Sequence, residues 1–248
     1  MYEKVKQIVK KILPKSFLEN QEQTIRKGLS IFYHGDKYQC NLCQQTFRKF
    51  IRLNSKDLLC PNCGSLPRTR GLWEIFQPHL SNKKVLHFSP TPTLKRAIQQ
   101  ITNKKNYITT DFENEFKADL TLNIEELDLE SGSIDLIICY HVLEHVTKDI
   151  QALEEIHRVL TKGGVVYIQT PFKEGDIFED YSIIEPADRL QQFGQEDHVR
   201  IYSPEGLFQR MTAVGLSTEL IKNHHPVDNY LGLKEKEIMN VLIITSRI

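Results

Sequence analysis

Four of the five cysteines stand in two identical pairs with the overall spacing C-x2-C-x16-C-x2-C, and they are Cys40, Cys43, Cys60 and Cys63. A C-x2-C turn places two thiolates on one side of a metal ion. Its repeat supplies the two further ligands that complete a tetrahedron, which is the arrangement that Zn²⁺ prefers in structural sites. The spacing therefore predicts a structural zinc site within a cysteine unit at residues 38–66.

Cysteine would fill all four positions around this metal, so we expect no coordination site for substrate or water and no catalysis there. Gly64 follows the second pair, where a tight turn is helped by a residue free to take positive φ. The alternatives are buried free thiols or a redox pair, which needs only one C-x2-C. Disulfides are less expected in a reducing cytosol. The fifth cysteine, Cys139, is more typical of a packing residue than of a nucleophile.

Two carboxylates follow neighbouring predicted strands. Asp111 stands at the end of the strand expected at residues 106–110, and Asp119 lies in the short one expected at 117–120. In a doubly wound sheet, ligands bind at the carboxyl ends of the strands. A carboxylate there can accept hydrogen bonds from both ribose hydroxyls, and a second can reach an exocyclic amine on adenine. Either acid alone would be an ordinary solvated group.

Histidines gather in two further segments, "CYHVLEHV" (residues 139–146) and "FGQEDHVRIYSPEGL" (residues 193–207). Imidazole has a resting pKa suited to accepting a proton near neutral pH. We rank His198 first as a base because its acidic neighbour Asp197 could orient it, and His141 and His145 are further candidates. The alternative for the second segment is a surface loop with its own hydrogen bonds.

The elements that must position these groups alternate from Lys83 onward. Strands are expected at 84–88, 106–110, 117–120, 134–140 and 164–169, and helices at 93–101 and 148–160, the latter ending at a Gly163-Gly164 cap. Ile150 would lie on the buried face of the second helix. This alternation predicts a parallel sheet with right-handed crossovers. After a long polar segment, 171–203, we expect a helix at 204–214 and an edge hairpin from strands 217–223 and 240–246.

Residues 83–248 resemble the class I S-adenosylmethionine-dependent methyltransferases of the type 11-like group. The resemblance rests on the Asp111 and Asp119 positions, on "IDLIICYHVLEHV", and on "ALEEIHRVLTKGGVVYIQTP", in which Leu160 to Gly164 matches an "LKPGG"-like turn. It implies a doubly wound, mostly parallel, seven-stranded Rossmann-like sheet, and a segment at 172–203 that closes over substrate. The cofactor residues it implies are Phe88, Ser89, Pro90, Asp111, Phe112, Asp119, Leu120, Tyr140, His141 and His145; the catalytic residues would be His198, Asp197 and His141.

The chain departs from the family at the first turn, where Ser89-Pro90-Thr91-Pro92 replaces a glycine-rich sequence. Glycines let a backbone approach the pyrophosphate of a dinucleotide, and S-adenosylmethionine has no phosphate. Ser89, Thr91 and backbone groups can serve its amine and carboxylate instead. Thr91 or Thr93 can cap the helix, with Pro92 at an early helical position. The turn therefore favours S-adenosylmethionine over NAD.

The composition is that of an ordinary globular protein: 248 residues, 40% hydrophobic and 26% charged. No apolar run approaches the ~20 residues of a membrane span, and the N-terminus lacks the apolar core of a secretory signal, so we expect a cytoplasmic protein. Residues 1–81 hold 14 Lys/Arg against 6 Asp/Glu, and residues 82–248 hold 18 against 26. A basic front half suggests an anionic partner, unless it is only a solvated lysine-rich helix.

We therefore predict three parts: an N-terminal helical segment (1–37), a four-cysteine zinc ribbon (38–70) and a methyltransferase domain (71–248). The acceptor would be a small molecule or a glycan or lipid precursor. The second interpretation is an RNA base methyltransferase, because a four-cysteine ribbon ahead of this fold resembles the bacterial ribosomal RNA guanine-N1 methyltransferases. The third is a zinc-ribbon binding protein whose domain has lost its cofactor.

Overall fold

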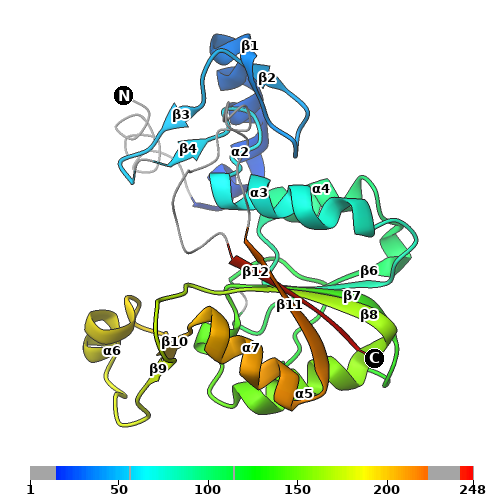
Figure 1. The fold of residues 1–248 in the computed structure, drawn as a ribbon. Coiled ribbons are helices and arrows are strands. Elements are labelled where there is room, and N and C mark those ends of the chain that lie inside the picture. Colours follow the sequence, from blue (N-terminus) through cyan, green and yellow to red (C-terminus); the bar gives the residue numbers. More distant parts are fainter. Residues whose placement is uncertain (1–14, 56, 114, 223–240, 248) are drawn as a thin grey trace. The chain divides into compact units, whose positions relative to one another are not determined.

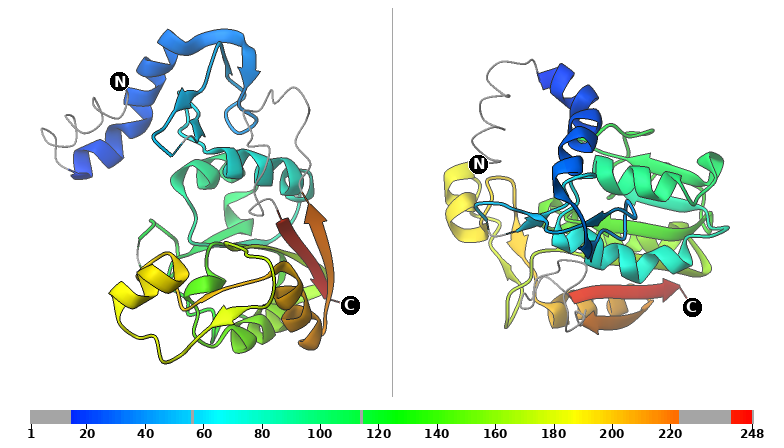
Figure 2. Two further views of the ribbon diagram at one scale, coloured as in Figure 1. Left: turned by 60° about the vertical axis from the view of Figure 1, so that its left-hand side comes forward. Right: turned by 90° about the horizontal axis from the view of Figure 1, so that it is seen from above.

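The computed structural model describes residues 15–55, 57–113, 115–222 and 241–247. The first predicted helix, built on Val5, Ile8, Val9 and Ile12, lies outside the described residues. The described residues fall into two units that divide after Gln77 (Figures 1 and 2). The three-part division predicted above stays a prediction. Among the described residues, no helix combines the length and the apolar character needed to cross a membrane.

The first unit is small and is built around two short antiparallel strand pairs. Its elements are α2 (Lys15–Ser30), η1 (Ile31–Tyr33), β1 (His34–Gln39), β2 (Thr46–Phe47), β3 (Ile51–Arg52), β4 (Leu58–Leu59) and α3 (Pro67–Phe76). Its core is small, and its buried aromatic side chains are Phe47, Phe50, Trp73 and Phe76. The guanidinium of Arg70, which is also fully buried, lies 4.3 Å from the centroid of the Phe50 ring. A core of this size is marginal for a unit that folds alone.

The second unit is a three-layer α/β structure. A 3-10 turn, η2 (Gln77–His79), leads into it. Its strands are β5 (Val85–Phe88), β6 (Tyr107–Thr110), β7 (Ile134–Tyr140), β8 (Leu160–Gln169), β9 (Phe178–Glu179), β10 (Arg200–Ile201), β11 (Leu216–Lys222) and β12 (Val241–Arg247). Its helices are α4 (Pro92–Gln99), η3 (Lys104–Asn106), η4 (Leu143–His145), α5 (Asp149–Val159), α6 (Pro186–Phe193) and α7 (Pro204–Ala213). α4 covers one face of the main sheet, and α5 and α7 cover the other (Figures 1 and 2).

The main sheet has the strand order β11-β12-β8-β7-β5-β6. β6, β5, β7 and β8 are parallel, because the apolar runs that form them are joined by crossovers. β11 and β12 pair antiparallel over seven residues each, which confirms the predicted hairpin at the edge of the sheet. Strand β7 is buried along most of its length, as expected for the centre of a doubly wound sheet.

Six strands form this sheet among the described residues, not the predicted seven, because residues 117–120 do not become a strand. Leu120 makes only an isolated bridge to Thr110. The side chain of Asp119 accepts from both the backbone N–H and the hydroxyl of Thr109, at 3.1 and 2.6 Å. The Asp119 side chain thus takes the backbone N–H of Thr109, which a neighbouring strand would otherwise use. The strand pairing with β6 therefore does not extend beyond the single bridge.

Three other predictions about local structure need correction. α5 ends at Val159, and Gly163-Gly164 lies inside β8 rather than capping the helix, because β8 begins early, at Leu160. Ile150, expected on the buried face of α5, is 41% exposed. The polar segment after β8 contains α6 and the small pair β9–β10, neither of which was predicted. At α7 the prediction is confirmed: Ser203 accepts from the N–H of Gly206 as its N-cap, and Pro204 follows.

Arg200 fixes the segment after β8 onto the loop that follows β7. Its guanidinium is fully buried and donates to the carbonyls of Leu143, Val146 and Thr147, the latter at 2.9 Å. It also donates to Glu179 of β9 at 3.0 Å. One side chain therefore binds backbone groups of residues 143–147 and a carboxylate of the 172–203 segment together.

Asp149, at the start of α5, extends this buried network. Its carboxylate pairs with Arg210 and accepts from the hydroxyl of Tyr202 at 2.6 Å. Arg210 also donates to Glu179. Although partial burial opposes it, the hydrogen bonds from Arg210 and Arg200 hold the pKa of Glu179 below its ordinary value. These two arginines and two carboxylates satisfy one another's charges, and we call them the Arg200 network.

Replacing Arg200 by methionine should loosen this attachment. Methionine fills similar space but donates no hydrogen bonds, so Glu179 loses one of its two arginine partners and three carbonyls lose a donor. Removing one member of a buried ionic network typically costs about 3–5 kcal/mol. We expect Arg200→Met to lower the free energy of unfolding in urea by about 3 kcal/mol or more. Amide hydrogen exchange in residues 193–202 should be faster under native conditions.

Arg189→Met is the matched control, since the Arg189 guanidinium donates to a single backbone carbonyl, that of Ile183. A substitution of that kind normally changes stability by less than about 1 kcal/mol. If Arg200→Met behaves like this control in both measurements, the network does not hold the segment.

Candidate functional site

The carboxyl ends of β5 and β7 both turn through a non-glycine residue in the left-handed region. Ser89 follows β5 with φ +46°, and His141 follows β7 with φ +53°. β5 and β7 are neighbours in register, with Phe88 opposite Cys139, so the two turns lie side by side. A non-glycine residue with positive φ costs of order 1–3 kcal/mol and is concentrated at functional sites. Both turns hold residues that the sequence assigned to the cofactor.

Asp111 lies next to the first turn. It is 3% exposed, and its carboxylate accepts from the hydroxyl of Ser89 at 2.9 Å and from the N–H of Phe116 at 2.9 Å. The buried acid thus joins the end of β6 to the end of β5. In this arrangement Ser89 and Asp111 form one polar group at the strand ends, as their predicted positions require.

Asp119 is the more open acid, with a side chain 55% exposed. Beyond its bonds to Thr109 it faces the ammonium of Lys95 at 3.9 Å. Phe112 and Leu120, which directly follow the two acids in the sequence, are 57% and 42% exposed. Carboxylates, which accept hydrogen bonds, alternate here with exposed apolar side chains, and this combination fits a nucleoside because the base has apolar faces and polar edges.

His87, in β5, is placed where it cannot exchange protons with a ligand. His87 is fully buried, and its Nδ1 lies 2.7 Å from the hydroxyl of Tyr107. Burial, with a smaller contribution from Lys95, lowers the pKa of His87 to about 3. The side chain is therefore neutral at physiological pH and serves to pack β5 against β6. Two other first-turn candidates, Phe88 and Pro90, are buried. Thr91 stands at the start of α4, and its side chain makes no capping hydrogen bond.

The histidines of the two predicted segments meet above the loop after β7. Their partners differ from those expected: Asp197 Oδ2 lies 3.0 Å from Nδ1 of His145, not against His198. His198 is 3% exposed, and its Nδ1 donates to the carbonyl of Phe193 at 3.2 Å. The His145 and His198 rings meet edge to face at 4.7 Å between centroids. The orientation of His198 by Asp197 was thus a wrong prediction, because the backbone turn at 193–198 directs Asp197 toward the other ring.

Glu144 is the residue of this cluster that sequence reasoning missed. It is 1% exposed, and its Oε1 lies 3.1 Å from Nδ1 of His141. The backbone N–H of Val199 donates to the Glu144 carbonyl at 2.9 Å, which joins the two segments directly. An acid between apolar residues and beside a histidine in "HVLEHV" was the available signal, since charged groups are rarely buried without a partner.

The four cysteines of the first unit converge as predicted. Cys40 and Cys60 are fully buried, and the four sulfur atoms lie within 4.8 Å of one another. The shortest approaches cross between the pairs, at 3.6 Å for Cys40–Cys63 and 3.7 Å for Cys43–Cys60. Four thiolates about 2.3 Å from a tetrahedral Zn²⁺ would lie about 3.8 Å apart, whereas a disulfide needs about 2.05 Å. The arrangement fits a metal ion and excludes disulfides.

The two C-x2-C turns share the same backbone pattern. Cys40 N–H donates to the carbonyl of Gln45, and Gln44 N–H donates back to the carbonyl of Cys40. Cys60 repeats both bonds with Ser65 and Gly64. Gly64 has φ +78°, as predicted, and its counterpart Gln44 takes φ +57° without being glycine. The two turns are thus one motif used twice, a symmetry that spacing alone did not reveal.

The four thiol groups also affect one another electrostatically. The proximity of Cys40 and Cys43 raises the pKa values of both Cys60 and Cys63. Four clustered thiols cannot all ionise unless a cation offsets the repulsion between the thiolates. Arg70 is a cation beside the cluster, and it donates to the carbonyls of Ser65 and Leu58 at 2.6 and 2.7 Å. Its single charge cannot offset four thiolates, so ionisation of all four needs a further cation such as a metal ion.

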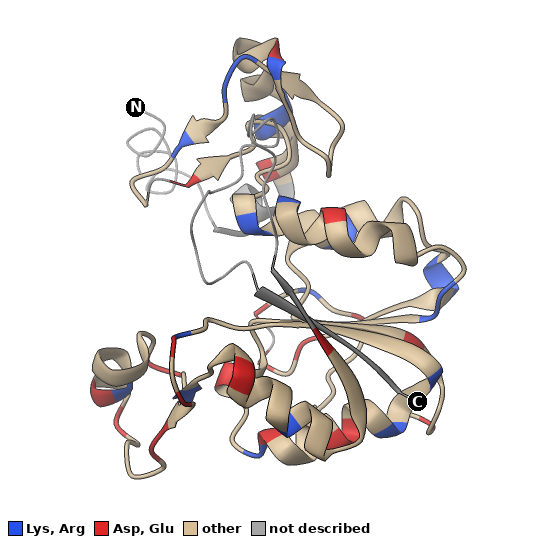
Figure 3. Ribbon diagram, in the orientation of Figure 1, with Lys and Arg blue, Asp and Glu red and all other residues tan. Residues whose placement is uncertain are grey.

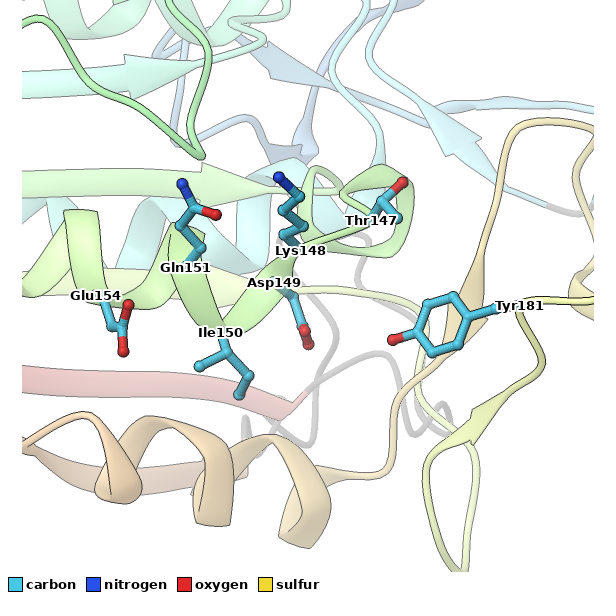
Figure 4. A pocket seen from close by; sticks show the side chains of 7 residues that line it. All are labelled: Thr147, Lys148, Asp149, Ile150, Gln151, Glu154 and Tyr181. Atoms are coloured by element: carbon cyan, nitrogen blue, oxygen red, sulfur yellow. The ribbon is translucent and has the colours of Figure 1, made fainter.

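A hollow of about 550 Å³ lies at the start of α5, where the Arg200 network meets the surface. Figure 4 shows Asp149 and Tyr181 pointing toward the same space from α5 and from the 172–203 segment. Its other lining residues are Thr147, Lys148, Ile150, Gln151 and Glu154. None of the predicted site residues lines it, so it is a separate feature from the strand-end site.

Comparisons with known proteins bear on the same region. Residues 73–168 match the family described as "Methyltransferase domain". A tRNA U34 carboxymethyltransferase of Sulfurimonas denitrificans is 26% identical over 172 residues, covering 64% of this chain and 52% of that protein. A protein of Mycolicibacterium smegmatis named "Probable S-adenosylmethionine-dependent methyltransferase" is 39% identical over 49 residues, or 20% of this chain and 19% of that protein. The chain thus spans about half or less of these relatives.

Among solved structures, an S-adenosylmethionine-dependent methyltransferase from Mesorhizobium loti has a TM-score of 0.52 at 11% identity, covering 71% of this chain and 98% of that one. This likeness supports the Rossmann-like fold and the parallel strands β6-β5-β7-β8. Residues 73–168 are therefore similar to a methyltransferase domain, and a part of a relative named as a probable S-adenosylmethionine-dependent methyltransferase also matches this chain.

Proposed function

We propose that the whole protein is an S-adenosylmethionine-dependent methyltransferase whose acceptor is an RNA. The observation that carries the first part is the set of side chains at the ends of β5 and β6. There Asp111 and Asp119 alternate with the exposed apolar side chains of Phe112 and Leu120. In this proposal the carboxylates hold the ribose hydroxyls and the adenine amine, and the apolar side chains cover the faces of the base.

The glycine-free first turn belongs to the same proposed site. Ser89 takes positive φ, and its hydroxyl is already bonded to Asp111. A ligand carboxylate or amine at this turn would meet the Ser89 hydroxyl, the backbone and the turn of His141 on the neighbouring strand. No pyrophosphate has to approach, so the missing glycines are no obstacle.

When bound, S-adenosylmethionine supplies a methyl group on a sulfonium, and the protein's task is alignment and proton removal. The acceptor atom forms a bond to the methyl carbon as the sulfur–carbon bond breaks, and an acceptor proton must leave. The candidate bases are three histidines. The loop after β7 carries His141 and His145, and the 172–203 segment that contacts it carries His198. His141 pairs with Glu144 through Nδ1, and its Nε2 has no hydrogen-bond partner among the described residues, so its imidazole is able to accept a proton.

Two observations favour RNA over the small-molecule acceptor expected from the sequence pattern. The first is the family of relatives, which includes tRNA U34 carboxymethyltransferases from two organisms. The second is the excess of eight positive charges in residues 1–81, since phosphates are the commonest anionic partner of such a surface. Figure 3 shows Lys and Arg on the strand pairs and on α3 of the first unit.

A transfer assay with tritiated S-adenosylmethionine and total tRNA tests this function. We expect label in RNA that nuclease treatment releases, and calorimetric binding of the cofactor without RNA. Asp111→Asn should weaken cofactor binding roughly 10–100-fold, because a charged hydrogen bond contributes about 1.5–3 kcal/mol. Raising the salt concentration should reduce RNA methylation steeply, as phosphate contacts require.

Glu113→Gln is the matched control, because Glu113 is an exposed acid two residues further along. It should leave cofactor binding unchanged. Failure of the wild-type protein to bind the cofactor would overturn the enzymatic proposal. Cofactor binding with no RNA labelling, but with labelling of a small hydroxyl or amine compound, would overturn the acceptor and restore the small-molecule prediction.

We further propose that the four cysteines hold a structural Zn²⁺. Support comes from the cross-pair sulfur distances, from the repeated turns, and from the small core of the first unit. Because all four positions are protein thiolates, this ion would be structural and would not contact substrate.

Removing this metal should unfold the first unit locally. In the protein stripped by chelator, or in Cys60→Ser, we expect amides of residues 38–66 to lose protection from hydrogen exchange while those of β7 keep it. Zinc content should fall by one equivalent in the variant. Cys139→Ser is the control, because this thiol is buried in β7, away from the cluster. Full protection of residues 38–66 without metal would contradict the assignment.

A further inference from the structure

We infer that Glu144, His145 and His198 form a second metal site, which binds a divalent first-row transition metal ion. The three side chains come from the loop after β7 and from the 172–203 segment, and their ligand atoms lie within 4.8 Å of one another. Two imidazoles and one carboxylate are the mixed donor set that such ions prefer, and an all-oxygen Mg²⁺ or Ca²⁺ site looks different.

Two buried ligand atoms of these residues have no hydrogen-bond partner, namely Oε2 of Glu144, which is 1% exposed, and Nε2 of His198, which is 3% exposed. Nε2 of the neighbouring His141 is a third such atom. A buried polar atom left unpaired costs about 1–3 kcal/mol, and more when it is charged. Two such atoms within reach of a third ligand indicate that something polar occupies the space between them. A cation satisfies both, since each offers a lone pair.

The outer contacts of the three residues match those of metal ligands. His198 Nδ1 donates to the carbonyl of Phe193, which leaves Nε2 unprotonated and free to ligate. His145 Nδ1 is held by Asp197 at 3.0 Å, so Nε2 is the nitrogen it has left. Glu144 Oε1 is held by His141, which directs Oε2 elsewhere. Metal-binding histidines usually donate their second nitrogen to a carboxylate or a carbonyl in this way.

The alternative is a cluster joined only by water or by its own hydrogen bonds. Hydrogen bonding among the three does not account for the two unpartnered atoms, and the His145 and His198 rings meet edge to face. One water molecule could donate to both atoms, but it is neutral and would leave the negative charge of the buried carboxylate uncompensated. A cation offsets that charge.

Three protein ligands leave coordination positions open, unlike the closed cysteine site of the first unit. An acceptor oxygen could bind there, and a cation lowers the pKa of a bound hydroxyl. Its proton would pass to solvent or to a neighbouring imidazole as the oxygen takes the methyl group. This role rests on the proposed function, whereas metal binding itself does not.

The test is a Co²⁺ titration of the metal-free full chain, followed by absorption spectroscopy, without cofactor or acceptor. We expect two classes of site. One shows the sulfur-to-metal charge transfer of thiolate ligands, and the other binds one equivalent without it. Glu144→Gln and His198→Ala should each abolish the second class and leave the first unchanged. Asp197→Asn should weaken the second class roughly 10–100-fold, the usual effect of losing an outer partner.

His34→Ala is the matched control, because it removes an exposed imidazole from the other unit. Should His198→Ala fail to fold, the wild-type protein still decides the matter. With Zn²⁺ in the thiolate site and Mn²⁺ added, spin-echo spectroscopy should detect two imidazole nitrogens on the bound ion. Binding of one equivalent only, an unaltered second class in Glu144→Gln, or a bound ion without imidazole ligation would each overturn the inference. Loss of activity alone would not be read as support.

Discussion

The buried guanidinium of Arg200 is the interaction on which the proposed catalytic side of this protein depends. It donates to carbonyls of the loop after β7 and to Glu179, and these buried bonds add to the contacts that Val199 and Asp197 make between the two segments. A planar fork with five donors can satisfy so many acceptors at once, and an ammonium cannot. Because β10 begins at Arg200, the residues just before it are placed as well, and His198 comes to lie against Glu144 and His145.

Two residues at the ends of β5 and β7 adopt strained backbone conformations. Ser89 and His141 take positive φ at adjacent parallel strands, where glycine would do so at no steric cost. Each compensates with a side-chain contact that glycine could not make: Ser89 donates to Asp111, and His141 pairs with Glu144. The missing glycines therefore do not mark a degenerate turn. The side chains that replace them are members of the polar groups at the site.

The parts of the fold that the sequence predicts are those determined by local periodicity. β7 is a buried apolar run, and both of its end residues were predicted correctly. The spacing of the four cysteines correctly predicted that their sulfur atoms come together. What failed depends on contacts between distant residues. Residues 117–120 read as a strand, but the Asp119 side chain takes the place of a ladder partner. Asp197 reads as the partner of its sequence neighbour His198, yet the turn directs it to His145.

The two proposed metal sites illustrate this difference. In the cysteine unit each half of the site is a four-residue turn, so local spacing specifies the ligands. The Glu144–His145–His198 cluster joins ligands more than fifty residues apart, and contacts between two segments, those of the Arg200 network among them, bring them together. A site assembled in this way can be opened by moving one segment, whereas a site made of two tight turns cannot open without unfolding. An open, segment-dependent site suits a step in which an acceptor must enter and leave, and a closed one suits support of the fold.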